Sequence, residues 1–352
     1  MPLKDQPIKI RPFVPLSCIA VWAIQDPAWA VTLTEDFSGD PQQAGWAVFG
    51  DPNLFVWNPA GENLQVTWDS TRPNSYFYRA LGFTLTRYDD FSLEFDLRLG
   101  DIASGVEPGK TGPLQIGLGF LNFAQATGTN FMRGAWGGAP DVAEFAYYTE
   151  GYYDFGGMIF PSRPSSVPSF IPGTDSYAYA PAFISAFEGE LPTNQTVHIR
   201  MVYSGADETA VLTVTSNGVT VGDFPPLELG SPANSQFTPA DTFRVDTFSI
   251  SSYSSAGDYY DSVLAHGAVD NLAVTARLRP IAHMVAGPDP GGVWQARFYG
   301  HSNWLYRLER SEDLSDWKPA CPDVAGAEDY MLLRDSGQGF PTAFYRVRAQ
   351  QP

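Results

Sequence analysis

The chain has 352 residues, enough for one large domain and a small one. Its 33 glycines, 29 prolines and 14% aromatic residues favour many short strands joined by turns. The formal charge of -18 argues against nucleic acid and anionic membranes as partners, because both require a basic surface. It suits a soluble extracellular protein that meets neutral or cationic ligands.

Residues 1–30 have the pattern of an export signal. A basic start precedes Phe13 to Ile24, a mostly apolar stretch too short to span a bilayer, and Ala28-Trp29-Ala30 then provides a small-x-small cleavage pattern. We therefore expect cleavage after Ala30 and a secreted or cell-surface location. Only Cys321 remains beyond that point, so no internal disulfide is expected. No later stretch is apolar enough for membrane insertion.

Alternating apolar and polar residues predict a series of short strands. The clearest is Phe91 to Leu99 (FSLEFDLRL), followed by Thr196 to Tyr203 (TVHIRMVY). Asn217-Gly218 supplies the positive φ angles of a type I′ turn, so Val211 to Val221 is predicted to be a hairpin. The other predicted strands are Thr32 to Phe37, Leu64 to Trp68, Tyr76 to Leu81, Leu114 to Phe120, Val142 to Tyr148 and Phe243 to Ile250. Roughly ten to thirteen strands without a convincing helix fit a two-sheet sandwich.

Residues 161–181 (PSRPSSVPSFIPGTDSYAYAP) are predicted to be a Pro/Ser-rich loop. A loop of this length inside a compact domain is either functional or a mobile surface excursion. The sequence does not choose between the two.

The strand pattern closes at Gly267 to Arg277 (GAVDNLAVTAR). Read with period 2, Asp270 is in phase with Leu272, Val274 and Ala276, so a carboxylate stands where an apolar side chain is expected. A buried carboxylate is costly unless it is hydrogen-bonded, paired or bound to a metal. The alternative is that Asp270 caps the preceding turn.

These strands resemble the concanavalin A-like lectin/glucanase jelly roll, in its laminin-G-like variety, over residues 31–278. The resemblance is carried by EDF at Glu35 to Phe37, by FSLEFDLRL, by HIRMVYSG followed by LTVTSNGVTV, and by VDNLAV. It implies an all-β, two-sheet jelly-roll sandwich. It also implies a structural calcium between the first and last strands, with Glu35, Asp36 and Asp270 at the matching positions. The alternative is that these carboxylates only cap their own strands and turns.

After a predicted linker at 279–292, residues 293–352 resemble a small C-terminal β-sandwich module of secreted bacterial proteins. The resemblance is carried by YRLERS at Tyr306 to Ser311, by LSDW at Leu314 to Trp317, and by FYRV at Phe344 to Val347. It implies an accessory or surface-association role.

The catalytic motif of the resembled hydrolases is incomplete. Laminarinase-type enzymes of the jelly roll use Glu-x-Asp-x-x-Glu on one strand, which aims a nucleophile and an acid at the sugar. Glu94-Phe95-Asp96 begins this pattern, but Leu99 occupies the position of the second glutamate, and Asp141 to Glu144 does not complete it either. Catalysis is therefore uncertain, and the motif argues against it. No other cofactor motif stands out, and the four histidines are too scattered to indicate a metal site.

A sugar-binding face is the better hypothesis. Sugars stack on Trp and Tyr and form hydrogen bonds with polar side chains. The candidate ligand-binding residues are Trp57, Tyr76, Tyr78, Glu94, Asp96, Trp136, Tyr148, Tyr152, His198 and Arg200, with Tyr147 and Tyr153 in the same aromatic run. The alternatives are that the aromatic residues form ordinary core and that the charged ones form a solvated sheet face.

Three functions remain open. The first is a secreted, non-catalytic carbohydrate-binding or cell-surface protein whose partner is a polysaccharide or glycan. The second is a polysaccharide-active enzyme, a glycoside hydrolase or lyase with a non-standard site, and the third is a structural envelope protein. A pair of carboxylates about 5–10 Å apart would favour hydrolysis, whereas an aromatic platform without such a pair would favour binding. The oligomeric state and the identity of the glycan are open.

Overall fold

The structure is a computed structural model that describes residues 21–25, 30–128, 141–148, 165–171, 187–188, 190–222, 227–228, 243–257, 260–337 and 343–351. It divides into a larger unit, Ala28–Arg279, and a smaller unit of Met1–Pro27 with Pro280–Pro352. Each unit has its own hydrophobic core. Among the described residues, no helix has the length and apolar character needed to cross a membrane.

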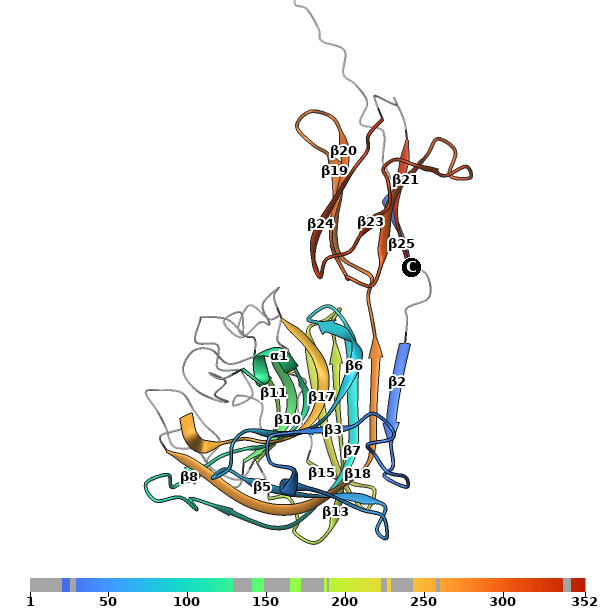
Figure 1. Cartoon of the computed structure of the whole chain (residues 1–352). Helices are drawn as coiled ribbons and strands as arrows, with labels where there is room; N and C mark the ends of the chain where they lie inside the picture. The colour runs from blue at the N-terminus through green and yellow to red at the C-terminus, as the bar shows by residue number, and fades with distance from the viewer. Residues whose placement is uncertain are drawn as a thin grey trace, which may run out of the picture. The chain divides into compact units, whose positions relative to one another are not determined.

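Two sheets build the larger unit (Figure 1). The β7 sheet contains β2 (Ala30–Glu35), β4 (Phe55–Asn58), β5 (Asn63–Asp69), β7 (Asp90–Ser104), β8 (Gly112–Pro113), β13 (Thr196–Ser204), β14 (Thr209–Ser216), β15 (Val219–Gly222), β16 (Leu227–Glu228) and β18 (Asp261–Arg277). The β9 sheet has the order β12-β11-β10-β9-β17-β6-β3. Its strands are β3 (Ala47–Phe49), β6 (Ser75–Thr86), β9 (Ile116–Leu121), β10 (Val142–Tyr148), β11 (Ser165–Ile171), β12 (Phe187–Glu188) and β17 (Arg244–Ser252).

The core lies between these two sheets. In β7, Leu93, Phe95 and Leu97 are buried, as the alternating pattern predicts. Across the core, the Phe95 ring lies 5.7 Å from the Phe145 ring of β10, and Phe91 lies 5.1 Å from Phe120 of β9. This arrangement confirms the predicted all-β jelly-roll sandwich. The helical elements of the described chain are single turns: α1 (Phe123–Ala126), η1 (Pro52–Leu54) and η4 (Ser255–Gly257).

Local turn chemistry was predicted well. Asn217 and Gly218 have φ angles of 51° and 74°, and Ser216 pairs with Val219, so β14 and β15 form the predicted hairpin. The loop predicted at 161–181 was wrong where it is described, because residues 165–171 form β11 beside β10. Pro168 is tolerated there because β12 pairs only with Ser165 and Ser166 in the described ladder, which leaves Pro168 on an edge segment.

The prediction that Asp270 lies on the same face of the strand as Leu272 and Val274 was also wrong. Val269 faces Leu97 in the β18–β7 ladder and is buried, whereas Asp270 faces Asp96 on the outer face. The register shifts between Asp270 and Ala273, and Asn271 has a φ of 49°. This β-bulge restores Leu272 and the residues after it to the core, so no apolar position is occupied by the carboxylate.

The smaller unit contains two sheets. The β21 sheet holds β1 (Val21–Gln25), β21 (Leu305–Ser311), β22 (Lys318–Pro319), β23 (Val324–Ala325) and β25 (Phe344–Gln350). The β20 sheet holds β19 (Ile281–Pro288), β20 (Trp294–Gly300) and β24 (Asp329–Arg334). Two of these strands come from segments for which the sequence predicted other roles. β1 lies in the expected export signal and pairs with β25, and β19 lies in the expected linker and pairs with β20. The export signal itself stays a prediction.

The motif residues of the smaller unit contact one another. Arg346 of β25 forms an ion pair with Glu309 of β21 at 2.6 Å, and its guanidinium lies 4.2 Å from the centre of the Trp317 ring. The Trp317 indole donates to the Leu314 carbonyl, which closes the LSDW turn. These residues therefore hold the β21–β25 pair and its turn together.

Asp335 is a buried acceptor in this unit. Its carboxylate accepts from Arg310 at 2.9 and 3.0 Å, from the Tyr345 hydroxyl at 2.9 Å and from the Gly337 amide at 2.7 Å. Burial, and then the Asp335 carboxylate, raises the pKa of Tyr345 to about 12. Tyr345 in turn stacks on Trp294, with ring centres 4.1 Å apart.

Replacing Asp335 with alanine should therefore destabilise the smaller unit by about 3–5 kcal/mol, because it leaves Arg310 without its buried partner. The matched control is Asp316→Ala, since the Asp316 side chain is 68% exposed and pairs with an exposed Lys318. The control should change the free energy of unfolding by about 0–1 kcal/mol. Urea unfolding of the full chain, followed by tryptophan fluorescence, measures both. Equal, small losses in the two variants would contradict the assignment.

Candidate functional site

A row of side chains crosses the outer face of the β9 sheet. The ladder registers place Ala47, Tyr78, Ser249, Gly119, Glu144 and Ser169 opposite one another on β3, β6, β17, β9, β10 and β11. The neighbouring row contains Phe49, Tyr76, Ser251 and Gly117. Phe77, Phe248 and Phe120, which alternate with these residues, lie in the core. We call Tyr76, Tyr78, Ser249, Ser251, Gly117, Gly119 and Glu144 the platform.

The middle of the platform has no large side chain. A Cβ atom on Gly119 would come within 2.4 Å of the Ala143 carbonyl and the Glu144 Cα, so only glycine fits. A Cβ on Gly117 would come within 2.6 Å of the Glu144 Oε2, which shows that the carboxylate lies over Gly117. Ser249 and Ser251 share a hydrogen bond of 2.8 Å beside these glycines.

Glu144 is a buried carboxylate at one end of the row. It is 1% exposed and accepts a hydrogen bond of 2.6 Å from the Tyr253 hydroxyl. Burying a carboxylate costs free energy unless polar groups satisfy it. The outer face therefore has a polar, solvent-shielded end.

The other end is aromatic and partly exposed. Phe49 is 36% exposed, and Tyr78 and Phe123 are half-buried, with the Tyr78 and Phe123 rings 4.3 Å apart. Phe49 stacks on Tyr76 at 5.8 Å and meets Phe123 edge-on at 6.2 Å. Tyr76 itself is fully buried, and its hydroxyl donates to the Ala126 carbonyl. A ligand approaching this face thus meets rings first.

The structure brings together only some of the predicted ligand-binding residues. Tyr76 and Tyr78 belong to the platform. Tyr148 is buried on the same strand as Glu144, four residues further along and on the same face. Tyr147 faces the core and accepts from the Leu191 amide. Trp136, Tyr152 and Tyr153 lie outside the described residues.

The predicted charged residues lie on the opposite side of the sandwich. Glu94, Asp96, His198 and Arg200 occupy the outward positions of β7 and β13. There Arg200 pairs with Glu94 at 2.7 Å and His198 with Asp96 at 2.9 Å. They form a partly exposed ion-pair network that shares no surface with the platform. Trp57 packs against the core, and its indole donates to the Phe37 carbonyl.

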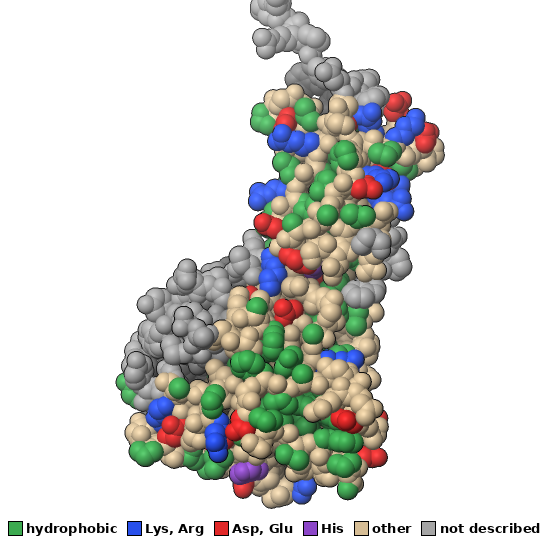
Figure 2. Space-filling view, viewed as in Figure 1, with side chains coloured by type: hydrophobic (Ala, Val, Ile, Leu, Met, Phe, Trp, Pro, Cys, Tyr) green, Lys and Arg blue, Asp and Glu red, His purple; other side chains and the backbone are tan. Residues whose placement is uncertain are grey.

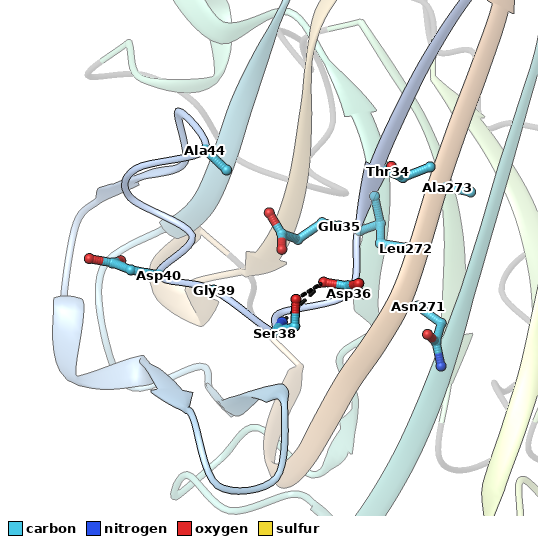
Figure 3. A pocket seen from close by; sticks show the side chains of 10 residues that line it. All are labelled: Thr34, Glu35, Asp36, Ser38, Gly39, Asp40, Ala44, Asn271, Leu272 and Ala273. Atoms are coloured by element: carbon cyan, nitrogen blue, oxygen red, sulfur yellow. Dashed lines mark hydrogen bonds between the residues drawn. The ribbon is translucent and has the colours of Figure 1, made fainter.

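The metal candidates line or adjoin an open hollow of about 460 Å³ between β2 and β18 (Figure 3). Both Glu35 oxygens are engaged, by the Phe37 amide at 2.9 Å and the Trp46 indole at 2.8 Å. The Asp36 carboxylate accepts from the Ser38 hydroxyl and amide, which lower its pKa. Figure 3 shows the Glu35 side chain directed away from Asn271, toward the segment that carries Asp40 and Ala44.

Asp270 adds a carboxylate that is close to other carboxylates near this hollow. Burial raises its pKa, the Asn271 amide lowers it, and Asp96, Asp36 and Glu62 raise it further by repulsion. Calcium would need several of these oxygens at 2.3–2.6 Å from one point. In the structure, the Glu35 carboxylate already accepts a hydrogen bond from the Trp46 indole. The described residues contain no group of three or more Asp, Glu, His or Cys side chains that could hold a metal ion. The three carboxylates therefore fit calcium poorly, and the calcium site stays a prediction.

No family model and no curated protein matches the chain. Among solved structures it is similar to peanut lectin with a 9mer peptide, at 14% identity and a TM-score of 0.40, over 72% of this chain and 100% of the lectin. A Lotus tetragonolobus seed lectin is 9% identical, with a TM-score of 0.44, over 71% of this chain and 99% of that lectin. The cellulose induced protein Cip1 is 11% identical, with a TM-score of 0.36, over 69% of this chain and 96% of that protein. These values are too low to transfer a ligand, and the fold assignment rests on the sheet order.

Most of the platform was missed by sequence reasoning. Gly117, Gly119, Ser249 and Ser251 carry no motif, and neither does the neighbouring Tyr253. Glu144 was considered only as part of a hydrolase pattern. A usable signal was present in LQIGLGF, where apolar residues alternate with Gln115 and two glycines. Such a strand buries one face and leaves almost no side chain on the other.

The charge repulsion at Asp270 can be tested with Asp270→Asn. The folded pKa is raised above the unfolded value, so the charged carboxylate destabilises the fold once the pH exceeds the unfolded pKa. The variant should therefore melt at a higher temperature than the native protein at pH 7 and at the same temperature near pH 3. Asp36→Asn should show the opposite sign at pH 7, because hydrogen bonds lower the pKa of Asp36.

The same melts decide the calcium prediction. If Asp270 is a ligand, excess calcium raises the midpoint of the native protein but not that of Asp270→Asn. An unchanged midpoint of the native protein with calcium and with chelator would contradict calcium binding.

Proposed function

We propose that the larger unit binds carbohydrate on the outer face of the β9 sheet, in a protein that is exported to the cell surface or secreted. The observation that supports this most is the partly exposed ring cluster of Phe49, Tyr78 and Phe123, which adjoins a polar row ending at Glu144. Sugar rings need both features, since their C–H faces stack on aromatic rings and their hydroxyls bond to polar groups.

The dimensions of the row suit an extended ligand. Tyr78 and Glu144 are separated by three strand spacings, about 14 Å at about 4.8 Å per strand. Between them lie only Ser249 and Gly119, which leave the backbone close to the surface of the sheet.

The charge distribution favours a neutral partner. Figure 2 shows acidic and basic side chains interspersed over the described part of the surface that faces the viewer, without a broad basic area there. The excess of 39 acidic over 21 basic residues opposes polyanionic ligands at long range.

An enzymatic function has one observation in its favour. The Glu144–Tyr253 pair is a buried carboxylate hydrogen-bonded to a phenol, and such pairs can move a proton. Glycoside hydrolysis, however, requires two carboxyl groups about 5–10 Å apart, and the row from Ala47 to Ser169 contains only Glu144. Binding without hydrolysis is therefore the better assignment. For the smaller unit, the YRLERS and FYRV resemblance supports an accessory or surface-association role.

Removing an exposed ring should weaken binding. We expect Tyr78→Ala and Phe49→Ala each to reduce glycan affinity by about 1–3 kcal/mol, by analogy with other aromatic stacking platforms. The matched control is Tyr260→Ala, since Tyr260 is 66% exposed and lies in the bend directly before β18, a strand of the β7 sheet. Glycan-array screening of the full chain identifies the ligand, and titration calorimetry measures the variants.

Two results would contradict the proposal. One is the absence of binding to any glycan on the array. The other is an unchanged affinity in Tyr78→Ala with an unchanged melting temperature. Release of reducing sugar by the native protein, abolished in Glu144→Gln, would favour the enzymatic alternative.

A further inference from the structure

The β21 sheet closes one of its edges with very short strands. On that side β21 pairs with β22 and β23, which are two residues long each, and β22 consists of Lys318 and Pro319. Short strands, lysine and proline keep a sheet edge from pairing with another chain, because they offer few backbone groups in register. The smaller unit therefore protects this edge with its own sequence.

The other edge is formed by β25, which is long and contains no proline. All seven residues from Phe344 to Gln350 pair with β21 on one side. On the other side β25 pairs in parallel with β1, from Val21 opposite Tyr345 to Gln25 opposite Ala349. In the full chain, the backbone groups of β25 that point away from β21 thus have β1 as their partner.

β1 belongs to the segment that the export prediction removes. The expected cleavage hydrolyses the Ala30–Val31 peptide bond with one water molecule, catalysed by the peptidase of the export machinery. The processed chain then keeps β25 but has lost the strand beside it. An edge strand without its neighbour is a template on which another extended chain can form backbone hydrogen bonds.

A second copy of β25 fits this edge poorly. Arg346 and Arg348 alternate along the strand with the buried Val347. A twofold antiparallel pair centred on Val347 places Arg346 opposite Arg348 of the second copy, and a pair centred on either arginine places that residue opposite itself. Like charges directly opposite each other destabilise a pair of strands. The registers that would pair most of β25 with itself are therefore unfavourable.

We propose that the edge of β25 in the processed protein binds an extended, uncharged and largely apolar segment of another protein, which adds to the β21 sheet as a parallel strand. The unprocessed strand β1 blocks this site. The inference rests on the proposed export, and it gives the surface-association role of the smaller unit a mode of contact. The partner is a polypeptide, since only a backbone with regularly spaced N–H and C=O groups continues the ladder.

The chemistry of the partner follows from the strand that occupies the edge. β1 has the sequence VWAIQ, with four apolar residues, one neutral polar residue and no charge. The register places Ala23 opposite Val347, which is fully buried, and Ile24 opposite Arg348, which is exposed. Every second residue of a partner strand thus aligns with the core face of β25, and the residues between align with its arginine face.

The blocking by β1 follows from its being part of the same chain. A segment tethered to its own site competes at an effective concentration of up to about millimolar. A free strand at micromolar concentration therefore does not displace it. Loss of β1 removes this competitor and leaves the residues of β25 unchanged.

Peptide binding to the two forms of the protein tests the proposal. The probe is a fluorescein-labelled peptide with the sequence of residues 20–26, AVWAIQD. It is titrated into the exported, processed protein and into the full chain 1–352 produced without export, with fluorescence anisotropy as the readout. We expect the processed protein to bind the peptide about tenfold more tightly or better, because its edge has no tethered competitor.

Two controls separate strand addition from simple stickiness. A scrambled peptide of the same composition should not bind, since it loses the alternation of β1. Ala23→Pro in the full chain should raise peptide binding to the level of the processed protein, because proline in the middle of β1 disrupts that strand.

The outcomes distinguish this site from the carbohydrate site. Equal binding of the native and scrambled peptides, or no binding to the processed protein, overturns the strand site, whereas glycan binding is judged separately by Tyr78→Ala. Mass spectrometry should find Val31 at the amino terminus of the exported protein, and retention of residues 21–25 overturns the opening of the edge. Self-association of the processed protein that the peptide abolishes, measured by sedimentation velocity, identifies a second copy as the occupant and overturns the assignment to another protein.

Discussion

The register of β18 is the constraint on which the larger unit depends. This strand of 17 residues pairs with β7, β5, β2 and β8, so one error in its phase would misalign several neighbours. Val269 and Val274 are both buried although they are five positions apart, which an unbroken strand does not allow. The bulge at Asn271 resolves this conflict, and the price is a carboxylate placed on the outer face opposite Asp96. A second shift at Gly267 occurs where a Cβ would come within 2.7 Å of the Arg98 carbonyl.

With that register in place, the sandwich separates two outer surfaces that differ in character. The outer face of β7 and β13 balances its charges in water through ion pairs such as Arg200–Glu94. The outer face of the β9 sheet instead shields a carboxylate and an amide and exposes rings beside them. Exposed ion pairs contribute little to stability, whereas buried polar groups are costly to keep. The two outer faces therefore differ in how much of their polar surface is withdrawn from water.

In the smaller unit, the residues of the YRLERS, LSDW and FYRV segments have a structural role. Glu309, Trp317 and Arg346 belong to three separate parts of the YRLERS, LSDW and FYRV pattern, yet they form one stack of ion pair and cation–π contact. Asp335, which lies outside the pattern, completes the unit by accepting from Arg310 and Tyr345. The contacts of these residues serve the packing of the β21–β25 pair and indicate no ligand by themselves.

The sequence alone determined the elements that depend on local rules. Period-2 alternation specified the inner faces of β7 and β13, and Asn217-Gly218 specified a hairpin, because neighbouring residues suffice for both. It also predicted Tyr76 and Tyr78 as candidates, because aromatic residues are recognisable by type, although Tyr76 is fully buried in the fold. Only the tertiary structure decided that Glu94 and His198 lie on the far side from Tyr78, that a bulge moves Asp270 outward, and that β11 replaces an expected loop. It alone placed the Glu144 carboxylate of β10 over Gly117 of β9 and beside the Tyr253 hydroxyl, since the order of strands in a sheet is set by long-range pairing rather than by local pattern.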